Sequence, residues 1–132
     1  MFRSSENKEF TFVNDCFQNK KKEEIGHYGQ TLIKEKTLYE YYNNFRYFQA
    51  KDSIAAWIYE TKFSVWYNAN ELKLKYRNAS IISSKRVVFN IKGNDFRLIV
   101  DIEYRLKIVC IVWFGTHGEY DKINVKTINY EN

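Results

Sequence analysis

Apolar residues in the second half of the chain recur at the spacing of β-strands. Stretches rich in β-branched and aromatic residues occupy 86–91 and 96–104, and an almost continuous apolar run covers 108–114. The intervening residues 92–95 include a glycine and an asparagine, which favour tight turns between strands. This pattern predicts three consecutive antiparallel strands.

The segment from residue 30 to residue 73 has a helical pattern after a short predicted strand at 30–34. Four aromatic or aliphatic residues follow the i, i+3, i+4, i+7 spacing of one helix face within 37–45 (Leu38, Tyr41, Tyr42 and Phe45). A second helix is predicted to begin at an N-cap on Asp52 or Ser53 and to include Thr61, and a short helical turn is predicted near 68–73. The order of elements predicts an α+β fold, with two helices packed on one face of a small antiparallel sheet.

Residues 1–28 are predicted to form an extension of uncertain order ahead of a single domain at 29–132. Charges within this extension cancel, so both a short docked element and a disordered lead remain open. Its first residues lack the apolar stretch of a secretory signal, and no apolar run approaches the ~20 residues of a membrane helix. We therefore expect a cytoplasmic protein without a membrane contact.

The positive charges are concentrated in the middle of the chain. The net charge is +5, and residues 73–97 contain seven cations against one acid, Asp95. The cations are Lys73, Lys75, Arg77, Lys85, Arg86, Lys92 and Arg97. A basic segment is typical of a surface that contacts phosphates, although a solvated face that keeps the protein soluble is the alternative. On the first interpretation Lys85, Arg86 and Lys92 would bind the substrate.

Two places carry residues suited to chemistry. Alternation along 96–104 places Arg97 on the face opposite the apolar side chains, where it would meet a ligand or, alternatively, pair with an acid such as Asp101. His117 and Tyr120 follow the last strand directly, and both side chains can exchange protons, although a structural histidine is the alternative. No metal-ligand spacing and no phosphate-binding or dinucleotide motif occurs, so neither a metal nor a cofactor is expected.

Two blocks of the chain carry a family resemblance. They are residues 86–100, Arg86-Val-Val-Phe-Asn-Ile-Lys-Gly-Asn-Asp-Phe-Arg-Leu-Ile-Val100, and residues 115–123, Gly115-Thr-His-Gly-Glu-Tyr-Asp-Lys-Ile123. Together they strongly resemble the HigB toxin family. A fainter resemblance extends back to Thr31. The resemblance as a whole implies a compact RelE-like fold and a type II toxin that cleaves mRNA on the ribosome. It also implies inhibition by a helix-turn-helix antitoxin, through which the toxin would reach operator DNA.

Carried over by position, the resemblance implies an active site of Lys92, Arg97, His117 and Tyr120, with Glu119 and Asp121 as possible supporting residues. Arginine and lysine would stabilise the phosphate, while histidine and tyrosine would share the acid and base roles in an order that the residues leave open.

The chain departs from the family pattern in two places besides its N-terminal extension. Family members often carry arginine where Val112 stands and lysine where Asp101 stands, and both changes remove positive charge. Two alternatives to an active nuclease therefore remain. One is a catalytically weak relative that acts by binding its antitoxin and repressing its operon. The other is a basic RNA-binding module that uses exposed aromatic rings.

Overall fold

The computed structural model describes residues 29–129, so the predicted extension at 1–28 and the last three residues of the predicted domain lie outside the described part. The elements are β1 (Thr31–Ile33), α2 (Glu35–Asn43), the 3-10 helix η1 (Phe45–Ala50), α3 (Lys51–Lys62), α4 (Ala69–Lys75), β2 (Ser80–Ile81), β3 (Arg86–Ile91), β4 (Phe96–Glu103), β5 (Ile108–Thr116) and α5 (His117–Tyr120). The predicted α+β class and the three-strand meander are confirmed. Among the helices of this described part, none is long and apolar enough to cross a membrane.

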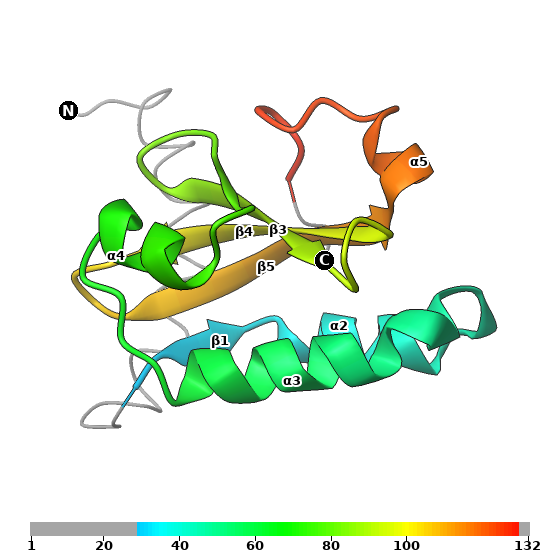
Figure 1. The fold of residues 1–132 in the computed structure, drawn as a ribbon, viewed down its shortest axis with the longest axis horizontal. Coiled ribbons are helices and arrows are strands. Elements are labelled where there is room, and N and C mark those ends of the chain that lie inside the picture. The colour runs from blue at the N-terminus through cyan, green and yellow to red at the C-terminus, as the bar shows by residue number, and fades with distance from the viewer. Residues whose placement is uncertain (1–28, 130–132) are drawn as a thin grey trace, which may run out of the picture.

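The sheet has five strands in the order β1-β5-β4-β3-β2 (Figure 1). Strands β3, β4 and β5 pair antiparallel in sequence order, whereas β1 pairs parallel to β5, with Thr31 opposite Ile108. The parallel pair is possible because α2, α3 and the rest of the meander lie between the two strands in sequence, which gives the crossover length that parallel strands need. The register of β4 against β5 shifts between Ile99 and Val100.

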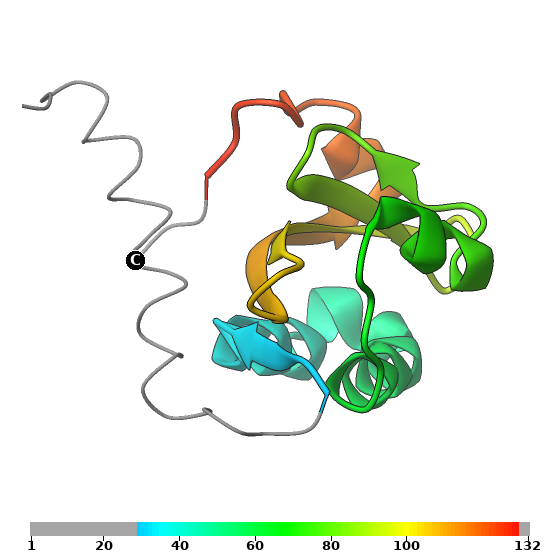
Figure 2. The same cartoon turned by 90° about the vertical axis from the view of Figure 1, so that its left-hand side faces the viewer.

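The helices α2 and α3 cover one face of the sheet, and the C-terminal segment lies on the other side (Figure 2). The main core fills the helical side. From β4 it receives the alternate residues predicted for this role (Phe96, Leu98, Val100 and Ile102), and from α3 it receives Ile54, Trp57 and Ile58. The predicted core face of β4 is therefore confirmed.

Two details of the predicted helices are wrong. Helix α2 ends at Asn43 because Asn44 adopts an extended conformation, so Phe45 leaves the apolar stripe and is 95% exposed. Helix α3 has neither Asp52 nor Ser53 as its N-cap, because η1 runs directly into it and Ala50 occupies the cap position. By contrast, the Asn68 side chain does cap α4, accepting a hydrogen bond from the Glu71 backbone N–H at 3.0 Å.

A second, smaller core occupies the face of the sheet that carries Arg97. Val88, Ile99 and Val112 are buried there, and residues after the last strand cover them, including Tyr120, Ile123, Val125 and Ile128. The sequence pattern did not reveal this core because only one apolar residue of β4, Ile99, points toward it. Its consequence is that the C-terminal segment is packed against the sheet and stays close to Arg97.

Candidate active site at the end of the sheet

Strand β5 passes directly into α5 through a reciprocal helix cap. The Thr116 hydroxyl accepts a hydrogen bond from the Glu119 backbone N–H at 3.1 Å, and Glu119 Oε1 accepts one from the Thr116 backbone N–H at 2.9 Å. A capping box of this kind satisfies two backbone donors that the helix itself leaves without partners. It therefore fixes the orientation of α5, which carries His117 and Tyr120, relative to the buried strand.

Arg97 lies on β4 opposite Gly115 and is held by the turn that precedes it. Its Nη1 donates to the backbone carbonyls of Asn94 and Phe96 at 3.0 and 3.2 Å, and its Nη2 donates to Asn94 Oδ1 at 2.9 Å. A guanidinium has five N–H donors. The Nε–H makes no hydrogen bond to residues 29–129, and Nη2, which carries two N–H groups, makes one. The guanidinium therefore keeps donors with which it can bind phosphate oxygens.

The Arg97 guanidinium also faces the ring of Tyr120, with Cζ 5.7 Å from the ring centre, which is within the range of a cation–π interaction. The Tyr120 ring in turn packs 6.3 Å from the ring of Trp113. The structure thus brings Arg97 and Tyr120 together from segments more than twenty residues apart.

The turn between β3 and β4 contacts α5 and brings Lys92 to the same end of the sheet. Lys92 and Gly93 both have positive φ, 55° and 65°, the left-handed conformation of a tight hairpin turn. The His117 backbone N–H donates to the Asp95 carbonyl at 2.9 Å, and Lys92 Nζ lies 3.4 Å from Asp95 Oδ2. Lys92 and Asp95 are both exposed, so this ion pair can open when an anion binds.

The His117 side chain is about half exposed, and its Nδ1 lies 3.8 Å from Asp121 Oδ1. This distance is too long for a strong hydrogen bond but places a carboxylate beside the imidazole. The structure therefore joins Arg97 to Tyr120 and His117 to Asp121, and it links Lys92 to the His117 backbone through Asp95. Within residues 29–129, no hydrogen bond or ion pair joins the Lys92 or His117 side chain to Arg97 or Tyr120.

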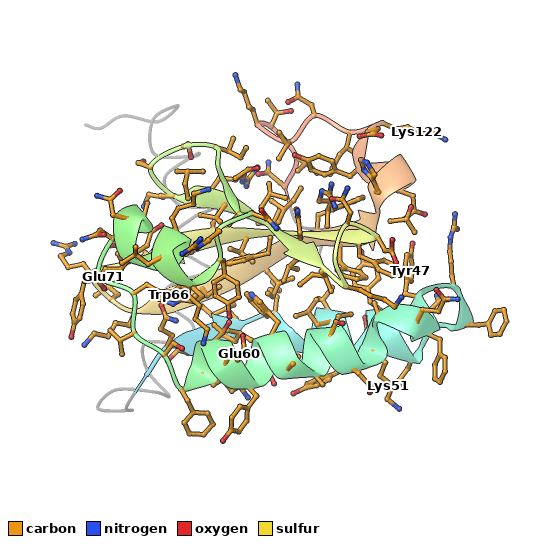
Figure 3. The ribbon with its side chains drawn as sticks, in the orientation of Figure 1. Tyr47, Lys51, Glu60, Trp66, Glu71 and Lys122 are labelled. Carbon is orange, nitrogen blue, oxygen red and sulfur yellow. The ribbon has the colours of Figure 1, made fainter. Side chains whose placement is uncertain are left out.

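Glu119 has a different environment from the other predicted residues of α5. Its carboxylate accepts hydrogen bonds from the Tyr47 hydroxyl at 3.1 and 3.2 Å and lies 2.9 Å from Arg46 Nη2, in addition to closing the cap. Burial, the hydrogen bond to Glu119 and the Glu119 charge raise the pKa of Tyr47. Glu119 thus connects α5 to η1, and the position of Tyr47 near this end is visible in Figure 3.

The sequence did not single out Tyr47 or Arg46, because η1 carries no motif and lies far from α5 along the chain. Gly115 is a third residue with a specific role here. A Cβ on Gly115 would lie 2.5 Å from the Trp113 ring and 2.7 Å from Glu119 Oε1, so glycine leaves the space that this carboxylate occupies.

Arg86 and Lys85, which the sequence suggested as substrate-binding residues, do not join this group. Arg86 is buried and forms a two-point ion pair with Asp101, with Nε and Nη2 each 2.8 Å from a carboxylate oxygen. Its Nη1 donates to the backbone carbonyls of Val125 and Ile128 at 3.1 and 2.6 Å. Arg86 therefore anchors the C-terminal segment, about 13 Å along the sheet from Arg97.

Four of the seven cations in the basic segment lie within 4.0 Å of a carboxylate, and three of these four carboxylates lie outside the segment. The ion pairs are Lys75 with Glu60, Lys85 with Glu103, Arg86 with Asp101 and Lys92 with Asp95, while Lys73 donates to backbone carbonyls. The acid Glu60 comes from α3 and two others from β4. The positive charge of this segment is therefore partly compensated in the fold.

The two departures from the family pattern have structural explanations. The Asp101 carboxylate is matched by Arg86, so its charge is not directed at Arg97. Val112 is buried in the second core beside Val88 and Ile99. No group of three or more histidine, cysteine, aspartate or glutamate side chains suited to a metal ion occurs within residues 29–129.

Residues 50–123, more than half of the 132-residue chain, match the model of the HigB_toxin family, described as the RelE-like toxic component of a toxin–antitoxin system. No curated protein matches the chain. The matched range contains Arg97, His117 and Tyr120 and begins after Arg46 and Tyr47, so part of the network around Glu119 lies outside it.

Proposed function

We propose that this chain, which belongs to the HigB family of RelE-like toxins, is a ribosome-dependent mRNA endoribonuclease. As the toxic component of a toxin–antitoxin system it has an antitoxin partner. In this proposal the partner is a helix-turn-helix protein that also brings the toxin to operator DNA, and the toxin acts in the cytoplasm. The observation that carries the proposal is the placement of Arg97 against Tyr120, beside the helical turn that presents His117.

The reaction that these side chains suit is metal-independent transesterification of RNA. A base removes the proton of the ribose 2′-OH, and the 2′-oxygen forms a bond to the adjacent phosphorus. The bond from phosphorus to the 5′-oxygen of the next nucleotide then breaks, and an acid protonates that oxygen. The products are a 2′,3′-cyclic phosphate and a 5′-hydroxyl, so no oxidant, metal or further reactant is consumed.

Each of these residues has a role in the proposed reaction. The remaining N–H donors of Arg97 bind the non-bridging phosphate oxygens, and Lys92 adds a second positive charge as the pentacoordinate phosphorus develops. His117 and Tyr120 form the acid–base pair, and Asp121 lies beside His117 to orient its ring. The ribosome supplies the positioning of the mRNA.

A catalytically weak relative is the second candidate, and one observation favours it. At position 112, where many family members carry arginine, this chain buries a valine in the second core, so β5 contributes no cation beside Arg97. Such a protein would retain antitoxin binding and operon repression. For the RNA-binding module with stacked aromatic rings the observations are divided. Trp57 is buried and Tyr41 packs against Phe114, whereas Phe45, Phe48, Tyr59, Phe63 and Tyr67 are exposed.

Induced expression in a bacterial host distinguishes the two candidates. The variants are Arg97→Ala, His117→Ala and Tyr120→Phe, which keeps the ring against Arg97 and removes only the hydroxyl. Lys36→Ala, which removes an exposed cation from α2, is the matched control. We expect growth arrest and cuts in translated mRNA from the wild type and the control, and strongly reduced cutting in the three site variants. Cuts must disappear when translation initiation is blocked.

Uncut mRNA in cells that contain folded wild-type protein would refute the nuclease and favour the weak relative. Cleavage that persists in both Arg97→Ala and His117→Ala would place the active site elsewhere in the molecule. Circular dichroism and thermal unfolding of the purified variants separate loss of activity from loss of fold.

A further inference from the structure

An open groove of about 610 Å³ lies at the opposite end of the sheet from α5. The loop before α4, the loop before β3, the end of β4 and the β4–β5 turn contribute its walls, including Tyr67, Lys85, Glu103, Tyr104, Arg105 and Lys107. Figure 1 shows α4 and the β4–β5 turn at the end of the molecule away from α5. The groove is therefore separate from the candidate active site.

Three cations line this groove against one carboxylate. Lys85 Nζ lies 3.3 Å from Glu103 Oε1, so these two charges compensate each other. Arg105 is exposed, and neither Arg105 nor Lys107 forms an ion pair with a carboxylate of residues 29–129. Glu71 does not line the groove, and its carboxylate accepts a hydrogen bond from the Tyr67 backbone N–H at 3.0 Å. The β4–β5 turn thus places at one groove two cations that have no carboxylate partner within residues 29–129, whereas four cations of the basic segment lie beside carboxylates.

Aromatic surface lies directly beside these cations. Lys107 Nζ is 5.6 Å from the centre of the Tyr67 ring, and Tyr67 is 63% exposed. Tyr104 is half-buried at the base of the turn, and its carbonyl accepts a hydrogen bond from the Lys107 backbone N–H at 3.2 Å. Exposed rings next to cations are the combination that binds single-stranded nucleic acid, because the cations hold phosphates and the rings stack with bases.

We propose that this groove binds the sugar–phosphate backbone of RNA at a position remote from the cleaved bond. Arg105 and Lys107 would contact phosphates, and Tyr67 would lie against a base or ribose. Arg97 and Glu103 are six residues apart on β4, about 20 Å along the strand, so the phosphate bound here is not the one that reacts. The inference rests on the proposed function for its choice of RNA as ligand, and it adds a contact that helps to position the RNA.

The test compares the double variant Arg105→Ala/Lys107→Ala with Lys36→Ala/Lys51→Ala, which removes two exposed lysines from the helical layer. Binding of a short, uncleavable 2′-O-methyl RNA and of ribosomes is measured by fluorescence anisotropy and sedimentation over a salt series. Loss of two phosphate contacts lowers the slope of log K against log salt concentration by about 1.4 for a single strand. We expect about tenfold weaker binding at low salt for the groove variant and wild-type binding for the control.

The two RNA probes distinguish the sources of the backbone. Weaker binding of the oligonucleotide indicates mRNA, and weaker binding of ribosomes alone indicates ribosomal RNA; either result supports the inference. Equal RNA affinity and equal salt dependence in the two double variants would overturn the inference. A groove variant that binds both RNA probes normally but binds its antitoxin more weakly would also overturn it, because the groove would then be a protein contact. Binding is measured without cleavage, so the two proposals can fail separately. If the wild type does not cleave mRNA but the groove variant binds RNA more weakly, only the nuclease proposal is contradicted. If the wild type cleaves mRNA and the groove variant binds RNA as tightly as the wild type, only the groove proposal is contradicted.

Discussion

The Tyr47 hydroxyl lies within hydrogen-bond distance of both carboxylate oxygens of Glu119, 72 residues further along the chain. The same carboxylate closes the cap of α5 and pairs with Arg46. Because α5 has only four residues, it has little intrinsic stability as a helix. Its position beside Arg97 therefore depends on bonds that reach it from the helical layer and from β5.

Removing the Tyr47 hydroxyl tests this dependence. We expect Tyr47→Phe to lower the free energy of unfolding by about 0.5–1.5 kcal/mol, the net contribution of one hydrogen bond. Tyr59→Phe is the matched control, because Tyr59 is 66% exposed and packs its ring against Phe63. Urea denaturation of both variants measures the difference, and equal midpoints for Tyr47→Phe and wild type would contradict the role assigned to this bond.

Alkaline pH should destabilise the protein partly through the same tyrosine. Burial, followed by the contact with Glu119, raises the pKa of Tyr47, so the folded state holds this proton more tightly than the unfolded chain does. The resulting stability is complete below the unfolded pKa of about 10 and is lost as pH rises through the folded pKa. Burial also raises the pKa of Tyr104, and burial with a hydrogen bond to Glu60 raises that of Tyr76.

Urea unfolding midpoints should be measured from about pH 8 to above pH 10, a range that includes the unfolded tyrosine pKa. Over this range the midpoint should fall less for Tyr47→Phe than for the wild type. Parallel pH profiles for the two proteins would show that Tyr47 ionisation has no part in the alkaline loss.

Breaking the pair of Arg86 and Asp101 should affect stability far more than breaking that of Lys85 and Glu103. Arg86→Leu leaves a partly buried carboxylate and two backbone carbonyls without their donor, which we expect to cost about 2–4 kcal/mol. Lys85→Leu removes one member of a more exposed pair and should cost less than about 1 kcal/mol. Chemical denaturation measures both, and similar losses would refute the anchoring role of Arg86.

The two glycines around α5 should respond oppositely to alanine. At Gly115 the added methyl meets the Trp113 ring and Glu119 Oε1, so the carboxylate must move and the cap must weaken. At Gly118 the nearest atom is Thr116 Oγ1 at 4.0 Å, and alanine favours a helical position by about 0.5–1 kcal/mol. Differential scanning calorimetry should show a lower Tm for Gly115→Ala and an equal or higher Tm for Gly118→Ala; the reverse order would rule out a steric clash at Gly115.

Local signals in the sequence were enough to predict the fold class, the three-strand meander and the core face of β4, because strand alternation and turn residues act between near neighbours. The segments around Arg97 and His117 carry the family resemblance in their residues alone, and the family match agrees with it. These properties depend on short stretches of the chain, so a single sequence is sufficient to predict them.

The charges that remain available for binding, by contrast, depend on how the elements pack. Arg86 lies in the basic segment, but Asp101 compensates its charge, and it donates a hydrogen bond to a backbone carbonyl of the C-terminal segment. Strand register places Asp101 opposite Arg86, and tertiary packing brings the C-terminal segment to it. The contact of Tyr47 with Glu119 depends in the same way on how η1 packs against the sheet end. Such pairings join residues far apart in the chain, and no local pattern encodes them, because their energies arise only when folding brings the groups within hydrogen-bond distance and removes water.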